Sequence, residues 1–183
     1  MLDPAAQQLA GWQNFYVIVG SSGAALIGIQ FLVIALIADM RKLALSADTV
    51  GAFATPTVVH LGGALAISAV MSAPWSSLLA ASIALALCGL GGLGYATWVT
   101  LRARRQTDYK PVWEDWIWHA FLPWSAYAAV TVGAVLLRTK TETALFVVAG
   151  GTLGLLLIAI HNAWDALTHV LVEVTRGNGT HKD

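Results

Sequence analysis

The sequence has little charge. Asp, Glu, Lys and Arg make up only 11% of the 183 residues, whereas a soluble domain usually contains about 25%. The 10 basic residues balance the 10 acidic ones, and no basic run with interleaved aromatic residues, of the kind that binds nucleic acid, is present. Since 57% of the residues are hydrophobic, the composition indicates a membrane protein in contact with the lipid bilayer, and no nucleic-acid partner is expected.

Cysteine and catalytic signatures are also scarce. Cys88 is the single cysteine, so no internal disulfide can form. The apolar segments hold no paired carboxylates, and the chain contains neither a nucleophile elbow nor a His-Glu-x-x-His motif. Residues 1–13 have no Lys or Arg, which differs from the basic start of a secretory signal peptide. We therefore expect a protein that is not an enzyme and that keeps its first apolar segment as a membrane span.

Five long apolar segments dominate what is present. They cover about 15–38, 49–73, 76–101, 116–137 and 143–165. Each approaches or exceeds the ~20 residues with which a helix crosses a hydrocarbon core of ~30 Å, and a helix satisfies its own backbone hydrogen bonds there. The sequence predicts an all-α integral membrane protein with five transmembrane helices in one domain, 1–172, and a short polar cytoplasmic tail, 173–183.

Lys and Arg are distributed unevenly between the two sides of these spans. The side that holds Arg138 and Lys140 has no other basic residue. Because basic loops stay in the cytoplasm, this asymmetry predicts an outside N-terminus, a cytoplasmic C-terminus and a bacterial-type inner (plasma) membrane. The basic residues of the other, cytoplasmic side are Arg41, Lys42, Arg102, Arg104, Arg105, Lys110, Arg176 and Lys182.

Small residues recur at helical spacing in two spans. They are Gly20, Ala24 and Gly28 in the first and Gly150 and Gly154 in the fifth. Small residues let helices approach closely, so we expect packing contacts here, either within one chain or between the subunits of a homo-oligomer. The run 89–94 matches a dinucleotide-binding glycine pattern, but that pattern requires a strand followed by a helix in water. Because the run lies within a span, helix packing is the interpretation we favour.

Histidines are the titratable groups inside the spans. With a rise of 1.5 Å per residue, His60 lies ~16 Å from the cytoplasmic end of its helix, His119 ~5 Å and His161 ~6 Å. All three are therefore expected in the cytoplasmic half of the membrane. Pro56 precedes His60 by four residues, and Pro123 follows His119 by four. A proline removes a helical donor, which for Pro123 is expected to free the carbonyl of His119.

These placements predict a polar vestibule on the cytoplasmic side. Polar groups at membrane depth are costly and mark pathways for ions or protons, and histidine titrates near neutral pH. We therefore expect a homo-oligomeric channel or transporter for ions or protons. The expected lining residues are Gln30, Thr57, His60, His119, His161, Asn162 and Asp165.

Other functions fit the same residues. His161 with Asp165, or Asp165 with His169, has the i,i+4 spacing that can chelate a metal ion. Haem held by His119 and His161 is a redox alternative, although tryptophans crowd these helices and no Cys-x-x-Cys-His motif is present. The primary expectation is that no cofactor is bound. Without transport, the protein would be a structural or regulatory membrane partner whose polar residues form interhelical hydrogen bonds.

Overall fold

The computed structural model describes residues 4–40, 47–104 and 113–179, and all regular structure in these ranges is helical. Side chains are described over 7–36, 55–104 and 113–168, except at position 115. The predicted all-α class is therefore confirmed for this part of the chain. The elements are α1 (Pro4–Ala10), α2 (Gln13–Met40), α3 (Ala47–Ser72), α4 (Leu78–Arg104), α5 (Trp113–Trp116), the π-helical turn η2 (Ile117–Phe121), α6 (Leu122–Leu136) and α7 (Thr141–Gly179).

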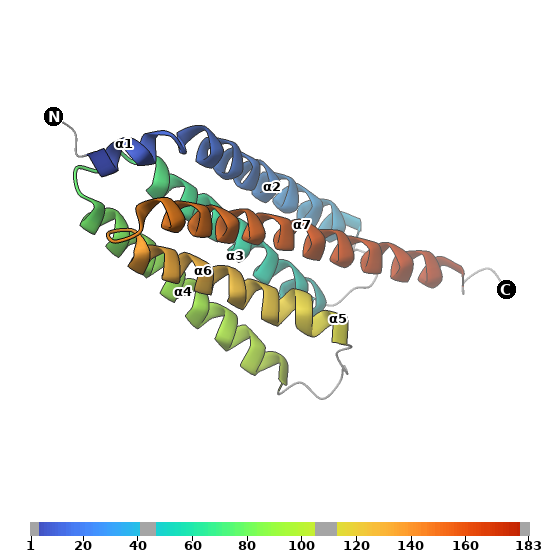
Figure 1. Cartoon of the computed structure of the whole chain (residues 1–183). Helices are drawn as coiled ribbons and strands as arrows, with labels where there is room; N and C mark the ends of the chain where they lie inside the picture. The colour runs from blue at the N-terminus through green and yellow to red at the C-terminus, as the bar shows by residue number, and fades with distance from the viewer. Residues whose placement is uncertain (1–3, 41–46, 105–112, 180–183) are drawn as a thin grey trace.

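The helices form an antiparallel bundle (Figure 1). The helices α2, α3 and α4, the α5–η2–α6 segment and α7 alternate in direction, so α1 and the end of α7 lie at opposite ends of the bundle. The most extensive contacts join α6 to α7, α2 to α3, α4 to α6 and α3 to α7. The helices α3, α4, α6 and α7 therefore share a core, and α2 packs mainly against α3.

Five segments are long and apolar enough to cross a membrane. They are Gln13–Leu36, Thr55–Ser72, Leu78–Arg104, Ile117–Leu136 and Thr141–Thr168. Each matches one of the five predicted spans. This architecture supports a multi-pass membrane protein.

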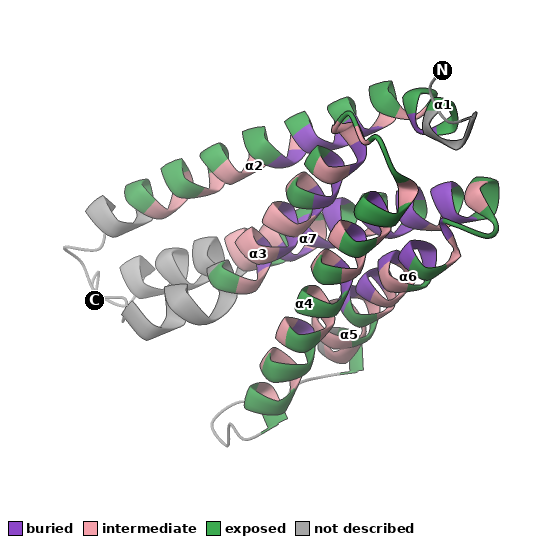
Figure 2. Cartoon of the chain, turned by 90° about the vertical axis from the view of Figure 1, so that its left-hand side faces the viewer, coloured by how far each residue is buried: buried purple, intermediate pink, exposed green. Residues whose placement is uncertain are grey.

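Large apolar side chains are exposed on the outside of the bundle. Figure 2 shows exposed residues along the outer faces of the helices and buried ones toward the interior. Ile18, Leu87 and Val135 are each about two thirds exposed or more, at 66%, 68% and 71%. Small residues such as Ala64 and Ala134 are fully buried. Exposed apolar surface is unfavourable in water by roughly 25 cal/mol per Å², whereas hydrocarbon removes that cost. The outer surface is therefore suited to lipid.

Some of the predicted packing residues contact another helix of the same chain. A Cβ on Gly20 would lie 2.9 Å from the Cβ of Ser68, so α2 and α3 approach closely only because this residue is glycine. A Cβ on Gly154 would be in ordinary contact with Ala126, at 3.8 Å. The remaining predicted packing residues are exposed in the single chain: Ala24, Gly28 and Gly150.

The glycine-rich run on α4 packs against α6. A Cβ on Gly89 would overlap Thr131, and a Cβ on Gly92 would overlap the ring of Tyr127. Helix packing, rather than dinucleotide binding, is therefore confirmed as the role of these two glycines.

The last helix extends further than the sequence analysis expected. α7 has 39 residues, which corresponds to ~58 Å at 1.5 Å per residue. It continues through 173–179, the first part of the predicted polar tail. The helix can continue there because the segment after the span contains no proline and its first glycine is Gly177. The rest of the predicted tail, 180–183, lies outside the described residues.

Candidate functional site

Few polar side chains are fully buried in this bundle. Thr152 donates its hydroxyl to the carbonyl of Val148 on its own helix, at 2.6 Å. His60 and Asn162, by contrast, bond to other helices. Three of the buried polar residues were predicted to line the vestibule. The buried polar side chains of the described part of the chain are Thr57, His60, Ser68, Thr152 and Asn162.

Pro123 disturbs the helix that carries His119. The backbone N–H of Leu122 bonds to the carbonyl of Ile117, five residues back, as in a π-helix. In this register the donor for the carbonyl of Trp118 would be residue 123, and proline has no N–H. The side-chain amide of Asn162 donates to that carbonyl instead, at 3.4 Å. The carbonyl freed by the proline is therefore at Trp118, one residue before the predicted one, because the π-turn shifts the register.

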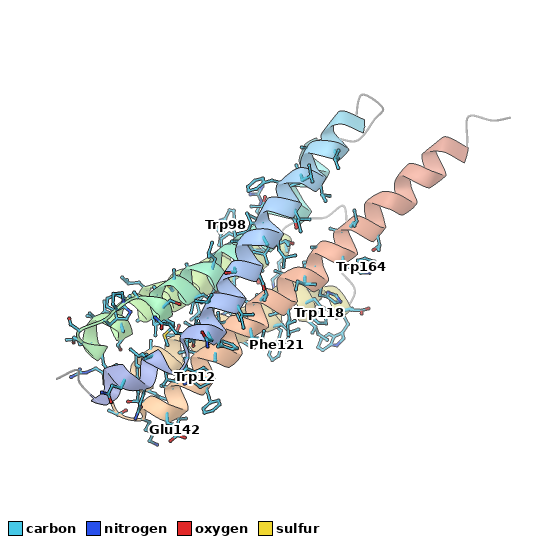
Figure 3. All side chains as sticks on the ribbon, turned by 90° about the horizontal axis from the view of Figure 1, so that it is seen from above. Trp12, Trp98, Trp118, Phe121, Glu142 and Trp164 are labelled. Carbon is cyan, nitrogen blue, oxygen red and sulfur yellow. The ribbon has the colours of Figure 1, made fainter. Side chains whose placement is uncertain are left out.

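Trp118 also positions His161, as its place beside α7 in Figure 3 suggests. The indole and imidazole rings stack with centroids 3.5 Å apart and an interplanar angle of 5°. Two consecutive residues of α7 thus engage one residue of η2. His161 stacks on the indole ring of Trp118, and the side-chain amide of Asn162 donates to the carbonyl of the same residue.

We define the polar cluster as Trp118, His119, His161 and Asn162. Three of its buried polar atoms have no hydrogen-bond partner among the described residues: Nδ1 of His119, Nδ1 of His161 and Oδ1 of Asn162. A buried polar atom left without a partner costs about 1–3 kcal/mol. Such atoms in a native fold point to bound water, an ion or a functional role.

His60 lies between two tyrosines. Its Nδ1 shares a hydrogen bond of 3.2 Å with the hydroxyl of Tyr127, and its ring meets Tyr95 edge-on, with centroids 6.2 Å apart. Residues of α4 and α6 therefore fix the position of His60 on α3.

The other predicted lining residues occupy different surroundings. Thr57 is buried on α3, three residues before His60. Gln30 is half-buried on α2, the helix that packs mainly on α3. Asp165 is exposed near the end of the fifth span. The structure thus brings His161 and Asn162 onto Trp118, the residue before His119, and leaves Asp165 exposed.

The predicted metal ligands are only partly described. Within the described side chains, no group of three His, Cys, Asp or Glu residues could hold a metal ion. His161 is half-buried and Asp165 is exposed, whereas the side chain of His169 lies outside the described residues. A closed site would need a further ligand from another helix.

The aromatic residues that organise this region were not among the predicted site residues. Tyr127 holds His60, and Trp118 holds His161 and Asn162. Aromatic residues in membrane proteins commonly occupy the interfaces, so residue type alone does not mark Tyr127 as a core residue. The sequence feature that could have indicated a buried Tyr127 is the presence of glycine at positions 63 and 92. These two glycines leave room for a large side chain between their helices.

Formal charge lies at the edge of the bundle. The guanidinium groups of Arg102 and Arg104 lie 5.5 Å from the ring centroids of Trp98 and Trp116. The polar cluster itself offers imidazole, amide and carbonyl groups, all of which can form hydrogen bonds with water. Comparison with known proteins finds no matching family model, no matching curated protein and no matching solved structure.

Proposed function

We propose that this protein moves protons or small ions across the membrane and that the polar cluster forms the cytoplasmic entrance of the path. The observation that carries the proposal is the set of three buried, unpartnered polar atoms beside a π-turn. Polar groups at membrane depth are costly. A hydrated path supplies hydrogen-bond partners for such groups and so offsets the cost of burying them.

Protons are the species that this cluster suits best. Within the five spans, none of the described Asp, Glu, Lys and Arg side chains is buried. A metal cation in the cluster would therefore lack a carboxylate to balance its charge. An imidazole can accept a proton at one nitrogen and release one from the other. In this proposal, the polar cluster takes up the proton, and His60, which shares a hydrogen bond with Tyr127, is a further titratable group within the bundle.

The distribution of basic residues supports an orientation for the path. Arg102 and Arg104 end α4 at the end of the bundle where α7 also ends. Because basic residues concentrate on the cytoplasmic side, we place this end in the cytoplasm and the N-terminus outside. A bacterial-type inner, or plasma, membrane is the location we propose.

We further propose that the protein assembles as a homo-oligomer. Ala24 and Gly28 on α2 and Gly150 on α7 are exposed in the single chain. Small residues of this kind let helices of neighbouring subunits approach closely. The five spans show no inverted repeat, so a channel-like assembly fits better than a transporter that rocks between two symmetric halves.

Flux measurements on purified protein in liposomes test the proposal. Proton and K⁺ gradients are imposed separately between about pH 5 and pH 8, the range in which histidine changes charge. We expect proton flux that falls strongly in His161→Ala and Asn162→Leu. The matched control is Thr97→Ala, an exposed residue on α4, which should keep normal flux.

Two outcomes separate the function from the site. Absence of flux in every gradient would refute transport. Proton flux that is unchanged in both cluster variants would leave transport standing and refute the assignment of the path to this cluster.

A further inference from the structure

A groove opens between α3 and α4. It has a volume of 270 Å³, and its lining includes the neighbouring glycines Gly62 and Gly63 on α3, Gly91 and Gly92 on α4, and the single cysteine, Cys88. These two helices contact each other much less than α3 contacts α2 or α7. The groove is apolar, and none of the residues of the polar cluster lines it.

One side chain holds the groove open. Tyr127 of α6 forms part of its lining. A Cβ on Gly63 would lie 2.6 Å from the tyrosine hydroxyl, and a Cβ on Gly92 would overlap the ring. Tyr127 thus packs between these two glycines and separates α3 from α4. The adjacent glycines, Gly62 and Gly91, have no neighbour within 4 Å of a built Cβ, so they leave space rather than make contact.

The groove lies at mid-membrane depth. Gly62 and Gly63 are near the middle of the Thr55–Ser72 span, and Gly91 and Gly92 are near the middle of Leu78–Arg104. The centre of a ~30 Å hydrocarbon core is ~15 Å from either headgroup region. Lipid headgroups therefore do not reach this level, whereas acyl chains do.

We propose that the groove binds a single hydrocarbon chain of a membrane lipid. A cavity of about 150 Å³ lined by apolar side chains is large enough for benzene, so 270 Å³ accommodates a segment of one chain. A helix, at ~10 Å in diameter, is too wide to enter such a space. A stable interface between two proteins also needs about 20–30 residues on each side, whereas nine residues line the groove. These sizes favour a lipid chain over a helix of a second copy.

Photocrosslinking in vesicles tests the proposal. The protein is reconstituted in phosphatidylcholine vesicles that contain a phosphatidylcholine with a diazirine at the middle of one acyl chain, and the crosslinked residues are mapped by mass spectrometry. We expect crosslinks to concentrate on groove residues, Cys88 included, above the exposed apolar positions Leu87 and Leu153. Uniform labelling of groove and outer surface would overturn the proposal, without any variant being needed.

Variants that fill the groove provide a second test in the same photocrosslinking experiment. Leucine at Gly62 and Gly91 would project into the groove, and neither glycine has a neighbour to clash with. The Gly62→Leu, Gly91→Leu double variant should lose the groove crosslinks, and the corresponding alanine pair should reduce them. Gly94→Leu is the matched control, because this glycine of α4 also has no neighbour within 4 Å and does not line the groove, and it should retain the crosslinks.

A second readout separates a lipid chain from a second copy. Cys88 in detergent should react more slowly with N-ethylmaleimide when phosphatidylcholine is added, and this protection should be lost in the double leucine variant. Crosslinks between two protein chains at the groove, together with loss of an oligomer in that variant, would overturn the proposal in favour of a subunit interface.

Discussion

Tyr127 connects three helices through one side chain. Its ring packs on the backbone of Gly92, and its hydroxyl lies close to Gly63 and shares a hydrogen bond with His60. The tyrosine is 2% exposed, so its position is fixed by packing on all sides. A change at this residue should therefore affect the α3–α4 spacing and the orientation of His60 together.

Gly63→Ala should destabilise the protein through this contact. The added Cβ would lie 2.6 Å from the hydroxyl of Tyr127, so the tyrosine must move and its bond to His60 weakens. Overpacking of this kind costs about 1–3 kcal/mol, which thermal unfolding in detergent would measure.

The neighbouring glycine is the control for this substitution. Gly62→Ala places a Cβ with no neighbour within 4 Å and should change stability little. In a Tyr127→Phe background, the nearest remaining ring atoms are 3.3 and 3.4 Å from the Gly63 Cβ, so Gly63→Ala should cost less. An equal loss of stability for both alanine variants would contradict this account of the tyrosine.

At the scale of elements, the π-turn is the least regular part of the bundle. It arises because Pro123 lacks the N–H that the carbonyl of Trp118 would accept in the shifted register. Asn162 supplies the missing donor from α7. The local backbone of one helix therefore depends on a side chain of another, which makes the α7–η2 contact specific rather than merely apolar.

A double-mutant cycle tests this dependence. Asn162→Leu removes the donor and should lower stability by about 1 kcal/mol, within the range measured for side-chain hydrogen bonds between membrane helices. Pro123→Ala restores a backbone N–H in that region, so the same leucine substitution should cost close to nothing in its background. The measurement is thermal unfolding of the four proteins. Additive effects would show that the proline and the asparagine are not coupled.

The spans themselves could be predicted from the sequence, because hydropathy and length determine which segments can cross a bilayer. The π-turn could not. Pro123 indicated a disturbed helix, but whether the backbone shifts to an i+5 register depends on a partner such as Asn162, which comes from 39 positions further along the chain. The late end of α7, by contrast, agrees with a local feature of the sequence, because no strong stop signal precedes Gly177.

The site was predicted in part for the same reason. Depth along a helix placed His119 and His161 at similar levels, and both contribute to the polar cluster. Sequence spacing contains no information on which residue of another helix faces a given histidine. Tyr127 and Trp118 were therefore missed, and the lining role of Asp165, which is exposed, stays a prediction.

At the scale of the whole molecule, an odd number of spans would place the start of the first span and the end of the fifth on opposite sides of a membrane. Figure 3 shows Trp12 and Glu142 toward one end and Trp98 and Trp164 toward the other half. With the basic residues in the cytoplasm, the turns at 73–77 and 137–140 should face outside.

Cysteine labelling tests this orientation. In a Cys88→Ala background, Ser76→Cys and Thr139→Cys should react with a charged, membrane-impermeant maleimide added to intact cells, since both positions are exposed in turns. Trp113→Cys, exposed at the opposite end, should react only after the cells are permeabilised. The reverse pattern would invert the proposed topology.

The contact of Tyr127 with Gly63 and Gly92 has a consequence for inheritance. A single substitution at any of the three positions leaves either an overlap or a void. A lineage can therefore exchange this tyrosine for a smaller residue, or either glycine for a larger one, most readily when the changes occur together. Among descendants of this chain, positions 63, 92 and 127 should vary as a linked set, while Gly62 and Gly91 drift independently unless the groove is in use.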